Sequence, residues 1–66
     1  MTLDITLDSE AEEVILVVDD YWILKANRDA SDNSLILNKH FHALKDEDEV
    51  LYRTLKDIAS KLLLMG

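Results

Sequence analysis

The chain has no cysteine and no proline, and its one glycine is Gly66. Without cysteine it can form neither disulfides nor thiolate zinc sites, and this composition fits a reducing compartment. Without an internal glycine it can build no phosphate-cradling loop. Tight hairpin turns normally need glycine at positive φ, so we expect longer connections based on asparagine or aspartate.

Size and apolar content indicate one small folded domain over residues 1–66. A chain of 66 residues buries only about 60% of its unfolded surface, which makes it marginally stable. Its 48% apolar content still suffices for a core and argues against disorder. No apolar stretch approaches a membrane span, and Met1 to Asp4 lack the basic start of a signal peptide. We therefore expect a cytoplasmic protein without membrane contact.

Charge is distributed unevenly along the chain. Residues 1–20 contain seven acids and no base, whereas residues 21–66 contain seven of each. The whole net charge of −7 therefore lies in the first third. Crowded like charges repel one another, so either a binding function or solubility alone maintains this asymmetry.

The first forty residues predict strands. Residues 2–8 alternate strictly between apolar and polar side chains, with the period of two that is typical of a half-buried strand. The run 13–18 is short, apolar and β-branched, as in a strand buried on both faces. A third strand over 21–27 and a fourth over 34–40 are separated by a polar loop. A rival interpretation makes 9–28 one helix capped by Ser9 and Glu12, but its β-branched and aromatic residues favour strands.

The last third predicts one helix over residues 46–64. Asp46 and Glu49 have the spacing of an N-terminal capping box. A single apolar stripe recurs at steps of three and four and consists of Leu51, Leu55, Ile58, Leu62 and Met65. The fold class that follows is α+β: a small antiparallel sheet of three to four strands, then this helix.

The sequence also predicts a second chain. One helix covers one face of a sheet, yet the runs 14–18 and 21–24 are apolar on both faces. A large exposed apolar patch usually marks an interface. We expect a homodimer or a docking subunit, with an interface formed by Val14, Leu16, Val18, Leu63 and Leu64. The alternative is that the strands curl and the N-terminal segment covers the second face.

Chemistry-bearing groups are sparse. No serine lies in a nucleophile-elbow context, and we expect neither catalysis nor a cofactor. His40 and His42 would share one face of an extended segment and hold half of a metal site, but surface histidines beside a core Phe41 are the more ordinary interpretation. Seven bases against fourteen acids give no basic footprint for direct nucleic-acid binding.

Residues 14–20, an apolar run that ends in Asp19-Asp20, resemble the first strand of a response-regulator receiver domain. That resemblance implies an acidic pair that helps to hold a magnesium ion. It covers seven residues only, and 66 residues are too few for the doubly wound α/β fold of a receiver. We therefore expect a core strand that ends in a solvated acidic turn.

We predict that the acidic residues of this chain bind a basic surface on a partner protein. The chain would be a small acidic regulator or inhibitor, in one version a DNA mimic that occupies a nucleic-acid-processing enzyme. The expected partner-binding residues are Asp8, Glu10, Glu12, Glu13, Asp19, Asp20 and Trp22. The alternative is a structural subunit that forms a homo-oligomer through apolar strands and the C-terminal helix.

Overall fold

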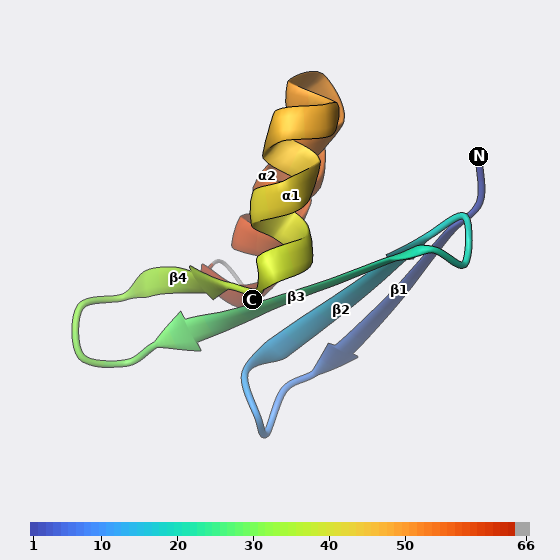
Figure 1. Cartoon of the computed structure of the whole chain (residues 1–66). Coiled ribbons are helices and arrows are strands. Elements are labelled where there is room, and N and C mark those ends of the chain that lie inside the picture. The colour runs from blue at the N-terminus through green and yellow to red at the C-terminus, as the bar shows by residue number, and fades with distance from the viewer. Residues whose placement is uncertain (65–66) are drawn as a thin grey trace.

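The chain folds as a four-stranded antiparallel sheet followed by two helices (Figure 1). The computed structural model describes residues 1–64. The strands follow one another across the sheet in chain order, and the elements are β1 (Leu3–Asp8), β2 (Glu13–Val18), β3 (Trp22–Asp29), β4 (Ser34–Leu37), α1 (Lys39–Glu47) and α2 (Glu49–Leu64). The predicted α+β class is confirmed, and the rival helix over residues 9–28 is excluded, since β2 and β3 occupy that segment.

The three hairpin turns contain no glycine and place other residues at positive φ. In the β2–β3 turn, Asp19 and Asp20 both have φ 53°, and the Tyr21 N–H donates to the Val18 carbonyl at 3.0 Å. Two successive residues at positive φ match the twist of the flanking strands, and aspartate tolerates this region better than most residues. The four-residue connections 9–12 and 30–33 each end in a residue at positive φ, namely Glu12 and Asn33.

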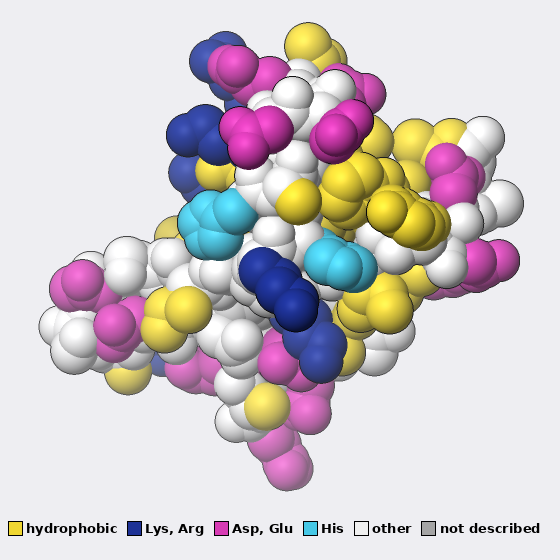
Figure 2. All heavy atoms as spheres, viewed as in Figure 1, with side chains coloured by type: hydrophobic (Ala, Val, Ile, Leu, Met, Phe, Trp, Pro, Cys, Tyr) yellow, Lys and Arg dark blue, Asp and Glu magenta, His cyan; other side chains and the backbone are white. Residues whose placement is uncertain are grey.

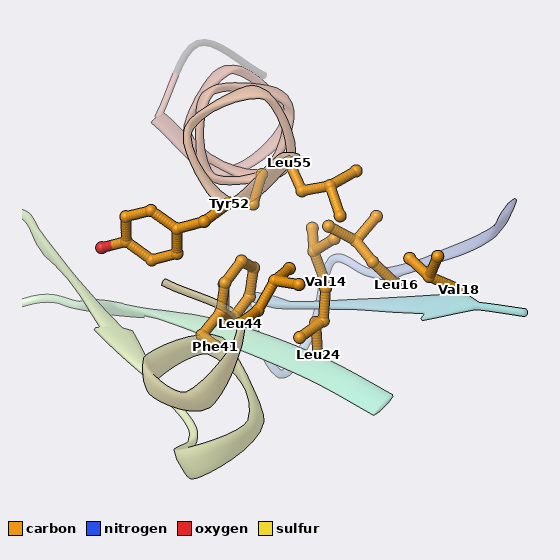
Figure 3. Packing of buried hydrophobic residues seen from close by; sticks show 10 residues of the cluster. Val14, Leu16, Val18, Leu24, Phe41, Leu44, Tyr52 and Leu55 are labelled. Atoms are coloured by element: carbon orange, nitrogen blue, oxygen red, sulfur yellow. The ribbon is translucent and has the colours of Figure 1, made fainter. Parts of the chain in front are cut away.

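Both helices pack on the same face of the sheet, over β2 and β3, with α2 on the β2 side and α1 on the β3 side (Figures 1 and 3). The core between these layers contains side chains that point inward from both layers. Its buried hydrophobic residues are Val14, Leu16, Val18, Leu24, Ala26, Phe41, Leu44, Tyr52, Leu55 and Ala59. Phe41 is fully buried, which confirms its expected core position, and its ring meets that of Tyr52 edge to face at 6.2 Å.

The helical region differs from its prediction, because it holds two helices where one over 46–64 was expected. The break falls at Asp48, which has φ −152° and ends α1. Its Oδ1 atom accepts the Leu51 N–H at 3.1 Å, as an N-cap side chain does. Asp48, not Asp46, is therefore the residue that starts the long helix, and Met65 of the predicted stripe lies outside the described residues.

The fourth strand is also shorter than predicted, since it ends at Leu37 and not at residue 40. Asn38 N-caps α1 through its Oδ1 atom, while its Nδ2 donates to the Ile23 carbonyl at 2.8 Å. The Nδ1 atom of His40 accepts the Ile23 N–H at 3.0 Å. The start of α1 therefore bonds the backbone N–H and C=O of Ile23 in β3, which a longer β4 would otherwise have paired. The chain can then leave the sheet at Leu37 and begin α1.

Candidate interaction surface

Two turns of closely similar construction lie at one end of the sheet. Each follows an aspartate at the end of a strand, Asp8 or Asp29, whose Oδ1 accepts the backbone N–H two residues later, at 3.1 Å and 2.9 Å respectively. Each contains four connecting residues and closes on a residue at positive φ. The order of the strands places the β1–β2 and β3–β4 turns at the same end and the β2–β3 turn at the other (Figure 1).

Arg28 joins these two turns. Its guanidinium forms an ion pair with Glu12 Oε1 and donates from Nη1 to Asn33 Oδ1 at 3.1 Å. Its backbone N–H donates to the Glu12 carbonyl at 3.1 Å. The planar fork of arginine suits such two-sided bonding. The base is thus bonded within the molecule, to the two positive-φ residues that close the turns.

The charge at this end is strongly negative. Its acids, which we call the acidic turn end, are Asp8, Glu10, Glu12, Glu13, Asp29 and Asp32. Arg28, near the end of β3, is the one base that bonds to these turns. The six acids and this base give the acidic turn end a charge of −5, out of a net charge of −7 for the chain. Figure 2 shows acidic side chains at the tips of both hairpins, the β1–β2 hairpin at the bottom and the β3–β4 hairpin at the left.

Most of these carboxylates are held in place. Asp32 Oδ1 accepts both the hydroxyl and the backbone N–H of Ser34, at 2.6 and 3.1 Å. The hydroxyl and then the backbone N–H of Ser31 hold the pKa of Asp29 below its ordinary value, because both bonds favour the charged form. Glu13 Oε2 accepts from the Asn27 side chain at 3.3 Å. Fixed side chains lose little entropy on binding, so these hydrogen bonds give the acidic turn end the order that a charged binding surface would need.

The predicted acidic residues do not form one surface. Asp19 and Asp20 lie in the β2–β3 turn, about 17 Å from the acidic turn end by the length of β2. Asp19 anchors the start of the chain, since its Oδ1 accepts the Thr2 N–H at 2.8 Å and its own N–H donates to the Thr2 carbonyl at 3.0 Å. The structure therefore groups four of the six predicted acids and separates the other two.

Sequence reasoning missed Asp29 and Asp32, which belong to the same end. They come after the acidic first third of the chain and were interpreted as part of a polar loop. The signal was present, because in a sheet whose strands follow one another in order the first and third turns lie at the same end. The distribution of charge along the chain does not reveal this grouping, because the two turns are adjacent only across the sheet.

The side chain of Trp22, one of the predicted partner-binding residues, is half-buried. Its ring meets the Tyr21 ring edge to face at 5.1 Å and the His40 ring at 5.9 Å. It also packs against the core. Tyr21, at 69% exposure, is the aromatic residue that this turn presents to the outside.

The predicted oligomer interface needs correction for its strand residues. Val14, Leu16 and Val18 are at most 1% exposed, because the helix pair covers their face of β2. Enclosed side chains cannot contact a second chain without opening the core. Leu63 packs partly against the core, and Leu64 is 37% exposed. Apolar residues that are exposed on the strands lie elsewhere: Ile5 and Leu7 in β1, Ile23 in β3 and Ile36 in β4.

His40 and His42 do not form the paired face that an extended segment would give. Both lie in α1, two residues apart and therefore about 200° apart around the helix. Among residues 1–64 no cluster of three or more histidine, aspartate or glutamate side chains is placed to hold a metal ion, and this part of the chain has no pocket. Neither α1 nor α2 has the length and apolar character that a membrane-spanning helix requires.

A scan against models of known protein families found no match, and neither did searches of curated proteins and of solved structures.

Proposed function

We propose that the chain is a non-enzymatic interaction module whose acidic turn end binds a basic surface on a partner protein, as a small regulator or inhibitor. The observation that carries the proposal is the convergence of two hairpin turns, with six acids and one internally bonded base, at one end of the sheet. A charged surface of this kind steers a basic partner and raises the association rate. A DNA-mimicking inhibitor is one specific form of this proposal. The absence of cysteine is compatible with binding in the reducing cytoplasm.

The geometry indicates how the charge can be removed while the turns are kept. Asparagine retains the Oδ1 acceptor that the turn amides need and loses the charge. A variant with Asp8→Asn, Glu10→Gln, Asp29→Asn and Asp32→Asn should therefore keep its fold and lose four charges. Four other acids give a control of equal net charge: Asp4→Asn, Asp46→Asn, Glu47→Gln and Asp57→Asn.

The test is capture of proteins from a cell lysate on the immobilised domain, with binding rates then measured for each identified candidate. A specific partner is retained at low ionic strength by the wild type and by the control, and its association rate on the four-site turn variant falls at least tenfold. High ionic strength weakens binding in the same way, because it screens exposed charges. An equal fall of the association rate in both variants would show that only the net charge of the protein determines binding. That result would reject the acidic turn end as the binding site.

The alternative, a structural subunit that assembles with itself, is favoured by a different observation. Ile5 and Leu7 are each 47% exposed on the face that carries the helices. Assembly through apolar contacts persists at high ionic strength, where binding through acids fails.

A further inference from the structure

Strand β1 has a free outer edge whose backbone groups are unpaired among residues 1–64. The Thr2 N–H donates to the Asp19 side chain, and the Thr2 carbonyl accepts the Asp19 N–H, so Thr2 turns its backbone groups toward β2. Successive residues of a strand alternate in this direction. The N–H and C=O groups of Leu3, Ile5 and Leu7 therefore point away from the sheet.

The same three residues have apolar side chains on the face that carries the helices. The register places them opposite the buried Val18, Leu16 and Val14 respectively. The helices lie over β2 and β3, so they cover Leu3 in part and leave Ile5 and Leu7 each 47% exposed. Proteins usually protect such an edge with lysine, proline or a bulge. β1 has no lysine, proline or bulge along Leu3–Asp8, and its two charged residues, Asp4 and Asp8, lie on the open face of the sheet.

We propose that the occupant of this edge is a second copy of the chain, paired antiparallel along β1 with Ile5 opposite Ile5 of the second copy. The two sheets then form one continuous sheet of eight strands with all helices on one side. Leu3 lies opposite Leu7 of the second copy, so the contact on the helix side is entirely apolar. Six backbone hydrogen bonds join the copies, because three outward-facing residues on each strand exchange their N–H and C=O groups.

Charge selects this register. With Ile5 at the two-fold axis, each Asp4 lies opposite Thr6 of the second copy and each Asp8 lies opposite Thr2. A threonine hydroxyl can donate to a carboxylate. With Thr6 at the axis, Asp4 would lie opposite Asp8, and with Asp4 at the axis it would lie opposite itself; like charges directly opposite destabilise a pair. A shift by one residue would place apolar side chains opposite polar ones.

The helices leave room for this arrangement. Strands lie about 4.8 Å apart, so an α2 helix over the boundary between β2 and β3 has its axis about 19 Å from that of the second copy. A helix with side chains is about 10 Å wide, and the two helices therefore do not collide. Leu51, Ile58 and Leu62 of α2 are partly buried against the core. At about 100° per residue they lie on the opposite side of Leu55 from Tyr52, whose ring contacts Phe41 of α1, so we infer that this flank of α2 is turned away from α1.

The open face of the sheet is the rival surface. Ile15, Val17 and Ile23 are apolar there, but the register surrounds them with Asp4 and Lys25. Pairing through that face would remove both charges from water, and this desolvation is costly even where the two charges pair with each other. The edge of β1 requires no such burial, because Asp4 and Asp8 remain on the side that faces water.

The first test is sedimentation equilibrium of the full chain. The wild type should reach 15.2 kDa, twice its 7.6 kDa, as concentration rises, and Ile5→Lys should remain at 7.6 kDa. Ile23→Lys is the matched control on the open face and should dimerise like the wild type. Circular dichroism checks that each variant is folded. A wild type that stays at 7.6 kDa, or a dimer lost in Ile23→Lys and kept in Ile5→Lys, would overturn the proposal.

The second test reads the register. Thr6→Lys places an ammonium opposite Asp4 of the second copy and should tighten the dimer several-fold, whereas Thr6→Asp should weaken it at least tenfold. Val50→Lys, on α2 where the side chain is 77% exposed, controls for the change in net charge. If Thr6 lay at the axis, Thr6→Lys would weaken the dimer instead, and the proposed register would be wrong.

Hydrogen exchange of the wild type gives a readout that needs no substitution. The Leu3, Ile5 and Leu7 amides should become protected as concentration rises, while the Asp4, Thr6 and Asp8 amides are protected at every concentration. Dimerisation without added protection of these three amides would overturn edge pairing. This inference is independent of the acidic turn end: added salt should strengthen association between two copies of net charge −7 and weaken binding of a basic partner.

Discussion

At the scale of single residues, most acids of the acidic turn end bond within the turns and also carry charge. Asp8, Asp29 and Asp32 each use one carboxylate oxygen to bind turn amides, and Glu12 bonds Arg28. In all three aspartates the second oxygen, Oδ2, has no hydrogen bond among residues 1–64. Glu10 has an exposed carboxylate with no hydrogen bond in this part of the chain. The turns therefore hold the three aspartates and Glu12 in place, and the unbonded oxygen atoms are those that the proposed basic partner would bind.

The titration of Asp29 reports this organisation directly. Ser31→Ala removes the hydroxyl bond, the larger cause of the lowered pKa, so the pKa of Asp29 should rise toward its ordinary value while the backbone bond keeps part of the shift. Because the folded-state pKa is lowered, the stabilisation is present above the unfolded-state pKa and is lost as pH falls through the folded-state value. NMR titration of the Asp29 carboxyl measures the change.

The matched control for that titration is Ser34→Ala, which removes the equivalent hydroxyl bond to Asp32. It should leave the Asp29 titration unchanged. An Asp29 pKa that stays in place after Ser31→Ala would show that the Ser31 hydroxyl does not bind the carboxylate in solution.

At the scale of elements, the helix pair determines which surfaces the protein presents. One long helix would cover a single strip of the sheet, whereas α1 and α2 together enclose both β2 and β3 on their face (Figure 3). The break between them at Asp48 lets the chain reverse direction. β1 lies beyond this cover, which is why its apolar residues are exposed.

The capping role of Asp48 gives a prediction that separates it from its neighbour. Asp48→Ala should lower the free energy of unfolding by about 1 kcal/mol, because the first turn of α2 loses its side-chain acceptor. Asp46→Ala, the control, should change it by less than about 0.5 kcal/mol, as surface substitutions usually do. Urea denaturation followed by circular dichroism measures both. Equal losses in the two variants would contradict the assignment of the helix start.

The sequence predicted β1 and β2 almost to the residue, because strict alternation and a β-branched run are strong local signals. It misplaced the helix start, since Asp46 and Asp48 both have the chemistry of a cap and only the path of the chain selects one. It extended β4 too far, since the hydrogen bonds that Ile23 forms with Asn38 and His40 join residues 15 and 17 positions apart in the chain. It also placed Val14, Leu16 and Val18 at an interface, because one helix could not have enclosed them.

At the scale of the whole molecule, charge and apolar surface are separated. The acidic turn end carries −5 of the net −7, and the exposed apolar side chains of β1 lie along the side of the sheet. Residues 1–64 contain no pocket, and both proposed contacts lie on the outer surface of the molecule. A basic partner and a second copy would therefore use different parts of that surface.

The most direct test of the central claim is an NMR titration of the labelled protein with a short oligolysine peptide. At low ionic strength the amide shifts should concentrate in residues 8–13 and 28–34 and should disappear at high ionic strength. The acids at 46–49 are an internal control, because they are as dense in sequence but lie at the connection between the helices. Shifts of equal size at residues 46–49, or none in the two turns, would contradict the claim that the acidic turn end is the binding surface.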